Sequence, residues 1–151
     1  MSEKNDEKIA KLNFKEVVSA IQTQDKEMLT TLFSRTSIEN ASTFDADMTE
    51  IMSYFRGEVV SYNDWDCLYV EDSRENGRIF QAMESTYDIK TTEDEYRLAI
   101  RFVTKDTLCP DNVGIHSLYL IKRQEDTLLT YAYWGDGKFT PGINIGVSNA
   151  E

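Results

Sequence analysis

The residues best suited to proton transfer are one histidine and two carboxylates on separate predicted strands. His116 is the single histidine of the 151 residues, and leucines follow two and four positions later, which predicts that the imidazole faces the same side of a strand as they do. Asp64 and Asp66 flank Trp65 on an earlier predicted strand. Such groups act as general acids and bases when an apolar pocket holds them near a substrate. No spacing ties His116 to one carboxylate, so no catalytic residue is assigned.

Aromatic side chains on the predicted strands form the alternative, a binding pocket. The segment WGDGKFTPGI, which starts at Trp134, places an aromatic ring and the carboxylate of Asp136 at the end of a predicted strand. The candidate ligand-binding residues are Tyr62, Trp65, Tyr87, Tyr96, His116, Trp134 and Asp136. A pocket lined in this way would accept a small apolar or amphipathic ligand.

Cofactor and metal chemistry have no motif in this sequence. The patterns GxxxxGK, GxGxxG, HExxH and GxSxG do not occur. Asp45 and Asp47, together with Glu50, lack the glycine and the ligand run of a calcium loop, and we expect them to cap a helix. Cys67 and Cys109 are too isolated for a CxxC metal site. We therefore expect neither a cofactor nor a metal ion.

The chain is strongly acidic. Asp and Glu number 27 against 16 Lys and Arg, a formal net charge of -11, which disfavours nucleic acid and anionic membrane surfaces as partners. Residues 57–112 carry 13 of these acids against 6 basic residues. This excess predicts either a solvated sheet face or a surface for a basic protein, such as a cationic enzyme held by an acidic inhibitor.

Helical patterns occupy the first third of the chain. An apolar stripe (Phe14, Val17, Val18, Ile21) predicts a helix over about 6–23, and a second stripe (Met48, Ile51, Met52, Phe55) predicts one that ends before Gly57. Asp25 is the expected N-cap of a short helix between them. Thr36 and Glu39 have the spacing of a capping box, which indicates a further helical turn.

Alternating patterns follow, and they predict strands. The expected strands lie near 58–70, 78–90, 95–102, 113–122 and 127–134. Asn76-Gly77 is the sequence of a two-residue hairpin turn. Helices first and strands afterwards predict an α+β fold in which the helices pack on one face of a curved antiparallel sheet. We expect residues 1–151 to form one domain, with residues 1–6 as a disordered leader.

Motifs in the last third carry a family resemblance. They are Asp106-Thr107, then the PDNVG that starts at Pro110 and runs into Ile115 and Ser117-Leu118, then the YWGD that starts at Tyr133, and Pro141-Gly142-Ile143. Together they resemble a family of uncharacterised bacterial proteins in the nuclear-transport-factor-2-like, or cystatin-like, superfamily. The resemblance implies a cone-shaped α+β fold and a secreted or lipid-anchored location, without an activity. The superfamily includes isomerases and dehydratases that use a carboxylate or a histidine inside the cone.

Three functions remain as hypotheses. The preferred one is a non-enzymatic binding domain with a small-ligand pocket between helices and sheet. The alternatives are an isomerase- or dehydratase-type acid/base enzyme that uses His116, and an acidic protein-binding inhibitor. No apolar stretch reaches the roughly 18 residues of a membrane-spanning helix. From the family resemblance we expect an extracytoplasmic location, secreted or lipid-anchored, rather than a cytoplasmic one.

A homodimer is the expected oligomeric state. Tyr119 and Ile121, beside Val113 and Ile115, place apolar side chains on the face of a predicted strand opposite Leu118 and Leu120, so that both faces are apolar. A strand that is apolar on two sides needs two covers, because one face alone can be buried by the helices. The sequence therefore predicts dimerisation through the outer face of the sheet.

Overall fold

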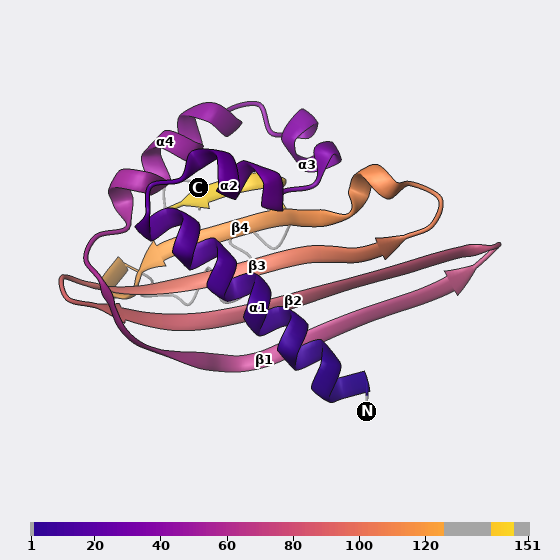
Figure 1. Cartoon of the computed structure of the whole chain (residues 1–151), viewed down its shortest axis with the longest axis horizontal. Helices are drawn as coiled ribbons and strands as arrows, with labels where there is room; N and C mark the ends of the chain where they lie inside the picture. Colours follow the sequence, from indigo (N-terminus) through magenta and orange to yellow (C-terminus); the bar gives the residue numbers. More distant parts are fainter. Residues whose placement is uncertain (1, 126–139, 147–151) are drawn as a thin grey trace.

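Four helices lie on one face of a sheet in the computed structural model (Figure 1). It describes residues 2–125 and 140–146, with the side chains of 2–5, 64–68 and 125 excepted. The helices in this part of the chain are α1 (Ser2–Gln22), α2 (Lys26–Leu32), α3 (Arg35–Asn40) and α4 (Phe44–Tyr54). The strands are β1 (Val59–Glu75), β2 (Arg78–Thr91), β3 (Glu95–Asp106), β4 (Gly114–Lys122) and β5 (Gly142–Ile145). The predicted α+β class is confirmed.

The apolar stripes of α1 and α4 face the core, as predicted. The buried stripe residues are Phe14, Val17, Val18, Ile21, Met48, Ile51, Met52 and Phe55. Asp25 is the N-cap of α2, because its Oδ1 accepts a hydrogen bond from the Met28 backbone N–H at 3.0 Å. The short helix α2 thus begins where the sequence places it.

Two helix starts differ from the prediction. α1 begins at Ser2, whereas the apolar stripe predicts a start near residue 6. Residues 2–6 contain no glycine or proline, and Glu3 and Lys4 are good helix formers. α3 is capped by Ser34, whose Oγ accepts from the Ser37 N–H at 3.0 Å, and not by Thr36. The capping residue is therefore Ser34, which directly precedes the first residue of α3.

The first four strands form the predicted antiparallel meander, in the order β1-β2-β3-β4. Asn76 and Gly77 have φ angles of 53° and 80°, the left-handed values that a type I′ turn requires. The turn pairs Glu75 with Arg78 and so sets the register of the β1–β2 hairpin.

The last described strand makes the sheet mixed. β5 pairs with β4 in parallel, from Ser117↔Gly142 to Leu120↔Ile145. β5 therefore extends the sheet beyond β4. The strand predicted near 127–134 falls outside the described residues.

The two faces of the sheet differ in character. The helix-facing side carries the apolar core, which includes Leu98, Ile100, Leu118 and Leu120. The outer side carries ion pairs between strands: Arg97–Asp88 at 2.8 Å and Arg101–Glu84 at 2.6 Å join β3 to β2, and Arg101–Glu71 at 3.2 Å joins β3 to β1. Part of the acidic excess of residues 57–112 is thus neutralised within the sheet.

The premise of the homodimer prediction is wrong in this structure. Tyr119 and Ile121 are 3% and 0% exposed within the single chain. Ile115 is fully buried in the helix-facing core, on the opposite side of the sheet from them. Val113 is the one exposed residue of the four, at 43%. The strand therefore needs no second copy to cover its outer face.

The Asp106 and Pro110–Asn112 motifs anchor the β3–β4 connection. The buried Asp106 carboxylate accepts two hydrogen bonds from the Arg78 guanidinium, at 2.6 and 3.0 Å. It also accepts from the Cys109 backbone N–H at 3.1 Å and from Asn112 Nδ2 at 2.9 Å. The hydrogen bonding by Arg78 holds the pKa of Asp106 far below its ordinary value, against the opposite effect of burial. These residues have a structural role.

Gly114 allows the start of β4 to touch the helical layer. Its φ is +127°, and a Cβ at this position would lie 2.7 Å from the Ser34 backbone nitrogen. The Ser34 N–H donates to the Ile115 carbonyl at 3.0 Å. Only glycine fits against the backbone at this strand entrance.

Candidate functional site

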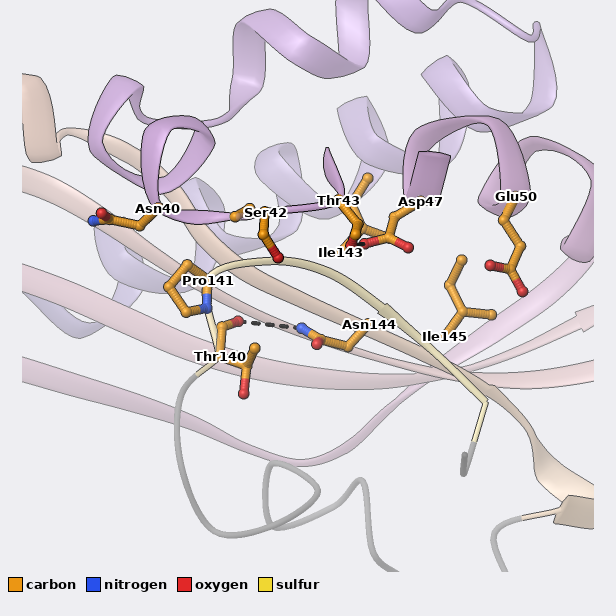
Figure 2. Close-up of a pocket in the computed structure, with 11 residues that line it drawn as sticks. Asn40, Ser42, Thr43, Asp47, Glu50, Thr140, Pro141, Ile143, Asn144 and Ile145 are labelled. Atoms are coloured by element: carbon orange, nitrogen blue, oxygen red, sulfur yellow. Dashed lines mark hydrogen bonds between the residues drawn. The ribbon is translucent and has the colours of Figure 1, made fainter. Parts of the chain in front are cut away.

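A cavity of about 370 Å³ lies between the α3–α4 connection, the first turns of α4, and β5 (Figure 2). The residues that line it are Asn40, Ala41, Ser42, Thr43, Asp47, Glu50, Thr140, Pro141, Ile143, Asn144 and Ile145. They come from two segments about a hundred residues apart in the chain. The cavity exists because β5 is brought beside the helices.

Ser37 and Gly142 hold β5 against the helical layer. The fully buried Ser37 hydroxyl donates to the His116 carbonyl at 2.6 Å and accepts from the Gly142 N–H at 3.1 Å. Gly142 has a φ of +91°, and a Cβ there would lie 2.7 Å from the Ala41 Cβ. A single serine therefore joins α3, β4 and β5, and the glycine permits their close approach.

The helical wall of the cavity carries two carboxylates. Thr43, the N-cap of α4, makes no side-chain capping bond to a backbone N–H of the helix, and its Oγ1 instead donates to the Asp47 side chain, at Oδ2, at 2.7 Å. Glu50 lies one turn further along α4, and its side chain extends toward Ile145 (Figure 2). Acidic residues in the first turn of a helix are stabilised by the helix dipole. Asp47 therefore fits the first turn of α4, which forms this wall.

The sheet side of the cavity is formed by β5 and the residues before it. Asn144 is 8% exposed, and its Nδ2 donates to the Thr140 carbonyl at 3.1 Å and to the Leu118 carbonyl at 3.5 Å. Figure 2 shows the Thr140–Asn144 bond beside Pro141. These bonds fix the amide, so this wall is ordered by the chain itself.

The arrangement suits recognition of a positive charge. The eleven lining residues include two carboxylates, three hydroxyls and two amides, and none is lysine, arginine or histidine. Among the described residues no group of three or more His, Cys, Asp or Glu is placed to hold a metal ion. The cavity can therefore accept hydrogen bonds and positive charge from a small organic ligand.

A second hollow of about 340 Å³ lies at the β2–β3 turn. Its charged lining residues have both signs: Lys90 and Arg123 face Glu93, Asp94 and Glu95. Its central hydroxyl, on Thr91, is already bonded to the Arg56 carbonyl at 2.7 Å. This site offers less selectivity than the cavity between α4 and β5.

Three tyrosines predicted to line a pocket pack against helical residues: Tyr62 and Tyr87 contact α1, and Tyr96 contacts the end of α4. Phe14 stacks on Tyr87 with 3.9 Å between ring centroids, and its centroid lies 4.9 Å from that of Tyr62. Tyr96 is fully buried, and its hydroxyl donates to the Tyr54 carbonyl at 3.0 Å and accepts from the Arg56 N–H at 2.8 Å. The structure places these tyrosines in the core and does not bring them to the cavity.

The remaining predicted residues are dispersed. The side chain of Trp65 and the whole of Trp134 and Asp136 lie outside what the structure describes. His116 is partly buried at the start of β4. No described residue of the predicted set lines the cavity between α4 and β5.

A bulge changes the predicted orientation of His116. The β3–β4 register shifts between Arg101 and Phe102, so Ile115 and Leu118 both enter the helix-facing core. His116 therefore does not share the side of Leu118, and its Nδ1 lies 2.8 Å from Ser117 Oγ. Burial, followed by the positive charge of Arg101, lowers the pKa of His116. In the described part of the chain, no carboxylate bonds to the imidazole.

The sequence did not identify the cavity residues as a site. The pattern around Asp47 and Glu50 predicts helix capping and lacks the ligand spacing of a calcium loop. Four other cavity residues belong to no predicted site: Asn40, Ser42, Thr43 and Asn144. Two signals were available: a polar stretch between two helices, and the turn residues of Thr140-Pro141-Gly142 before a short apolar run. Neither signal says that the two segments meet.

Comparison with known proteins gives a family. Residues 16–123 match the family described as a domain of unknown function, DUF5104. That match covers more than half of the chain and includes α2, α3, α4 and the first four strands. No curated protein matches the chain significantly. In the described residues, no helix is long and apolar enough to cross a membrane. The chain belongs to the DUF5104 family.

Proposed function

We propose that this protein is a non-enzymatic binding domain whose cavity between α4 and β5 takes a small polar ligand that carries a positive charge, such as a primary or quaternary amine. The observation that supports this is the pair Asp47 and Glu50 in a cavity without any basic lining residue. Around them, hydroxyl and amide groups provide directional hydrogen bonds. The ligand class differs from the apolar one expected from sequence, because Tyr62, Tyr87 and Tyr96 pack with the core and do not line the cavity.

Size and charge both support this ligand class. A volume of about 370 Å³ falls near the lower end of small-molecule sites, which span about 300–1,000 Å³. A carboxylate that bonds an ammonium group makes a charge-assisted hydrogen bond, roughly twice as strong as a neutral one. His116, the residue of the acid/base hypothesis, is not among the lining residues. Binding is therefore favoured over catalysis at this cavity.

We also propose a superfamily for the fold. We place the chain with the bacterial nuclear-transport-factor-2-like cones, whose ligand sites lie between helices and a curved sheet. The order of four helices before a sheet, with the helices on one face, supports this placement. The mixed edge formed by the parallel β5 departs from a plain antiparallel cone.

Calorimetric titration with small amines tests the proposed function. Choline, putrescine and ethanolamine are the cationic probes, with glucose as the neutral probe and succinate as the anionic one. We expect at least one amine to bind, and Asp47→Asn combined with Glu50→Gln to weaken it at least tenfold. Asp45→Asn is the matched control, because Asp45 shares the first turn of α4 but does not line the cavity.

Two results would contradict the proposal. One is binding of an amine with equal affinity to the wild type and the double variant, which would place the ligand elsewhere, for example at the β2–β3 hollow. The other is selective binding of succinate or glucose in place of every amine. Either result would remove the role assigned to the two carboxylates.

A further inference from the structure

The strand β1 forms one edge of the sheet along its whole length. The strand order is β1-β2-β3-β4-β5, so among the described residues β1 pairs on one side only, with β2. It is 17 residues long, and Figure 1 shows it along the border of the sheet away from β4 and β5. An edge strand presents unpaired N–H and C=O groups that a further strand can bind.

Only one part of β1 is regular enough to accept another strand. Register shifts interrupt β1 between Val59 and Ser61 and between Asp64 and Leu68. From Leu68 to Glu75 each residue pairs in turn with one residue of β2, down to Glu75↔Arg78. This end of the β1–β2 hairpin extends past the helices in Figure 1. The straight segment is therefore open to a partner.

The side chains of this segment are arranged for a partner with apolar and basic residues. Tyr69 is 57% exposed and Val70 is 39% exposed, and as neighbours in a strand they lie on opposite faces. The same alternation places Glu71 and Glu75 on the face of Tyr69. An added strand would thus meet an apolar residue on each face and, on the face of Tyr69, the exposed Glu75 carboxylate beside Glu71, which is ion-paired with Arg101.

Charge determines the kind of partner. β1 contains five acidic residues, Asp64, Asp66, Glu71, Asp72 and Glu75, and one basic residue, Arg74. Two β1 strands placed edge to edge would bring like charges together, which disfavours a second copy of this chain. Glu75 is exposed and has no ion pair among the described residues, so its charge is available to a partner. A lysine- or arginine-rich strand fits this edge.

We propose that Leu68–Glu75 of β1 binds an extended, basic segment of another protein as an added β-strand. Main-chain hydrogen bonds to the edge would supply affinity, and the acidic and apolar side chains would select the sequence. This surface is separate from the cavity between α4 and β5, so the two proposals stand or fall independently.

A synthetic peptide of about nine residues, alternating lysine with valine, is the probe. Amide chemical shifts of the ¹⁵N-labelled protein should move at 68–75 on titration, and the affinity should fall as salt is raised. Two further peptides carry N-methyl groups on alternate residues, one on each of the two alternate sets. Because successive N–H groups point to opposite edges of a strand, one methylated peptide should lose binding and the other should retain it.

Protein variants test the charge. Glu75→Lys should lower the affinity for the peptide by roughly two- to fivefold, the range that the loss of one exposed ion pair gives. Glu93→Lys is the matched control, because Glu93 is exposed in the β2–β3 turn and not on β1. Equal binding by both methylated peptides would overturn the proposal, since it would indicate charge attraction without strand addition. Shifts confined to residues outside β1, or dimerisation of the protein through β1, would also overturn it.

Discussion

Replacing Ser37 with alanine should destabilise the protein more than any other single serine-to-alanine change in the helices. The Ser37 hydroxyl is fully buried and bonds both the His116 carbonyl and the Gly142 N–H. The substitution leaves two buried backbone groups without this partner, at about 1–3 kcal/mol each. Allowing for relaxation of β5, we expect the free energy of unfolding to fall by about 2–4 kcal/mol.

Urea and thermal unfolding measure this loss. For a chain of this length each kcal/mol corresponds to a shift of roughly 2–4 °C in Tm, so the expected decrease is roughly 4–16 °C. Ser42→Ala is the control, because Ser42 is exposed beside the same strand, and it should change stability by less than about 0.5 kcal/mol. Hydrogen exchange gives a local readout: the Gly142 amide should lose protection in Ser37→Ala. A loss below about 0.5 kcal/mol with the Gly142 amide still protected would refute the assignment of Ser37 as the tie between α3 and β5.

Three further changes have defined outcomes. Tyr96→Phe removes the donor to the Tyr54 carbonyl and should cost about 1–2 kcal/mol in urea unfolding. Gly114→Ala should cost more, about 3 kcal/mol, because φ is +127° and the new Cβ would meet the Ser34 nitrogen at 2.7 Å. Asp106 has a lowered pKa when folded, so it stabilises the fold above its ordinary pKa of about 4, and that contribution is lost as the pH falls toward the folded value. Asp106→Asn should therefore lose stability at pH 7 and decline less than the wild type below about pH 4.

Each of these has an outcome that would contradict it. An unchanged urea midpoint for Tyr96→Phe would mean that the buried hydroxyl is dispensable. A Gly114→Ala protein as stable as the wild type would show that β4 can move away from Ser34. Parallel stability curves for the wild type and Asp106→Asn from pH 7 to pH 2 would refute the depressed pKa of that carboxyl.

Short-range sequence patterns predicted those helices, caps and turns that depend on residues close together in the chain. The stripe through Phe14 and Ile21, the cap at Asp25 and the turn at Asn76-Gly77 are confirmed, because each depends on residues within a few positions of one another. The orientation of His116 could not be read in this way. Strict alternation would place it with Leu118, and the bulge that breaks the alternation arises from pairing with β3.

The cavity depends on contacts that have no local signal. Asp47 reads as a helix-start residue, and Asn144 lies in a strand of four residues, too short for a clear period. The two meet because β5 pairs in parallel with β4 and is bonded to Ser37, and a single sequence does not encode that pairing in any spacing. For the same reason, the burial of Tyr119 and Ile121 within one chain could not be foreseen.

A crystal structure of the protein grown with the amine that binds best in calorimetry tests the central claim most directly. The account predicts density for that amine in the cavity between α4 and β5, with its nitrogen within about 3 Å of a carboxylate oxygen of Asp47 or Glu50. An empty cavity beside a well-ordered α4 and β5, with the amine bound at another surface, would contradict it.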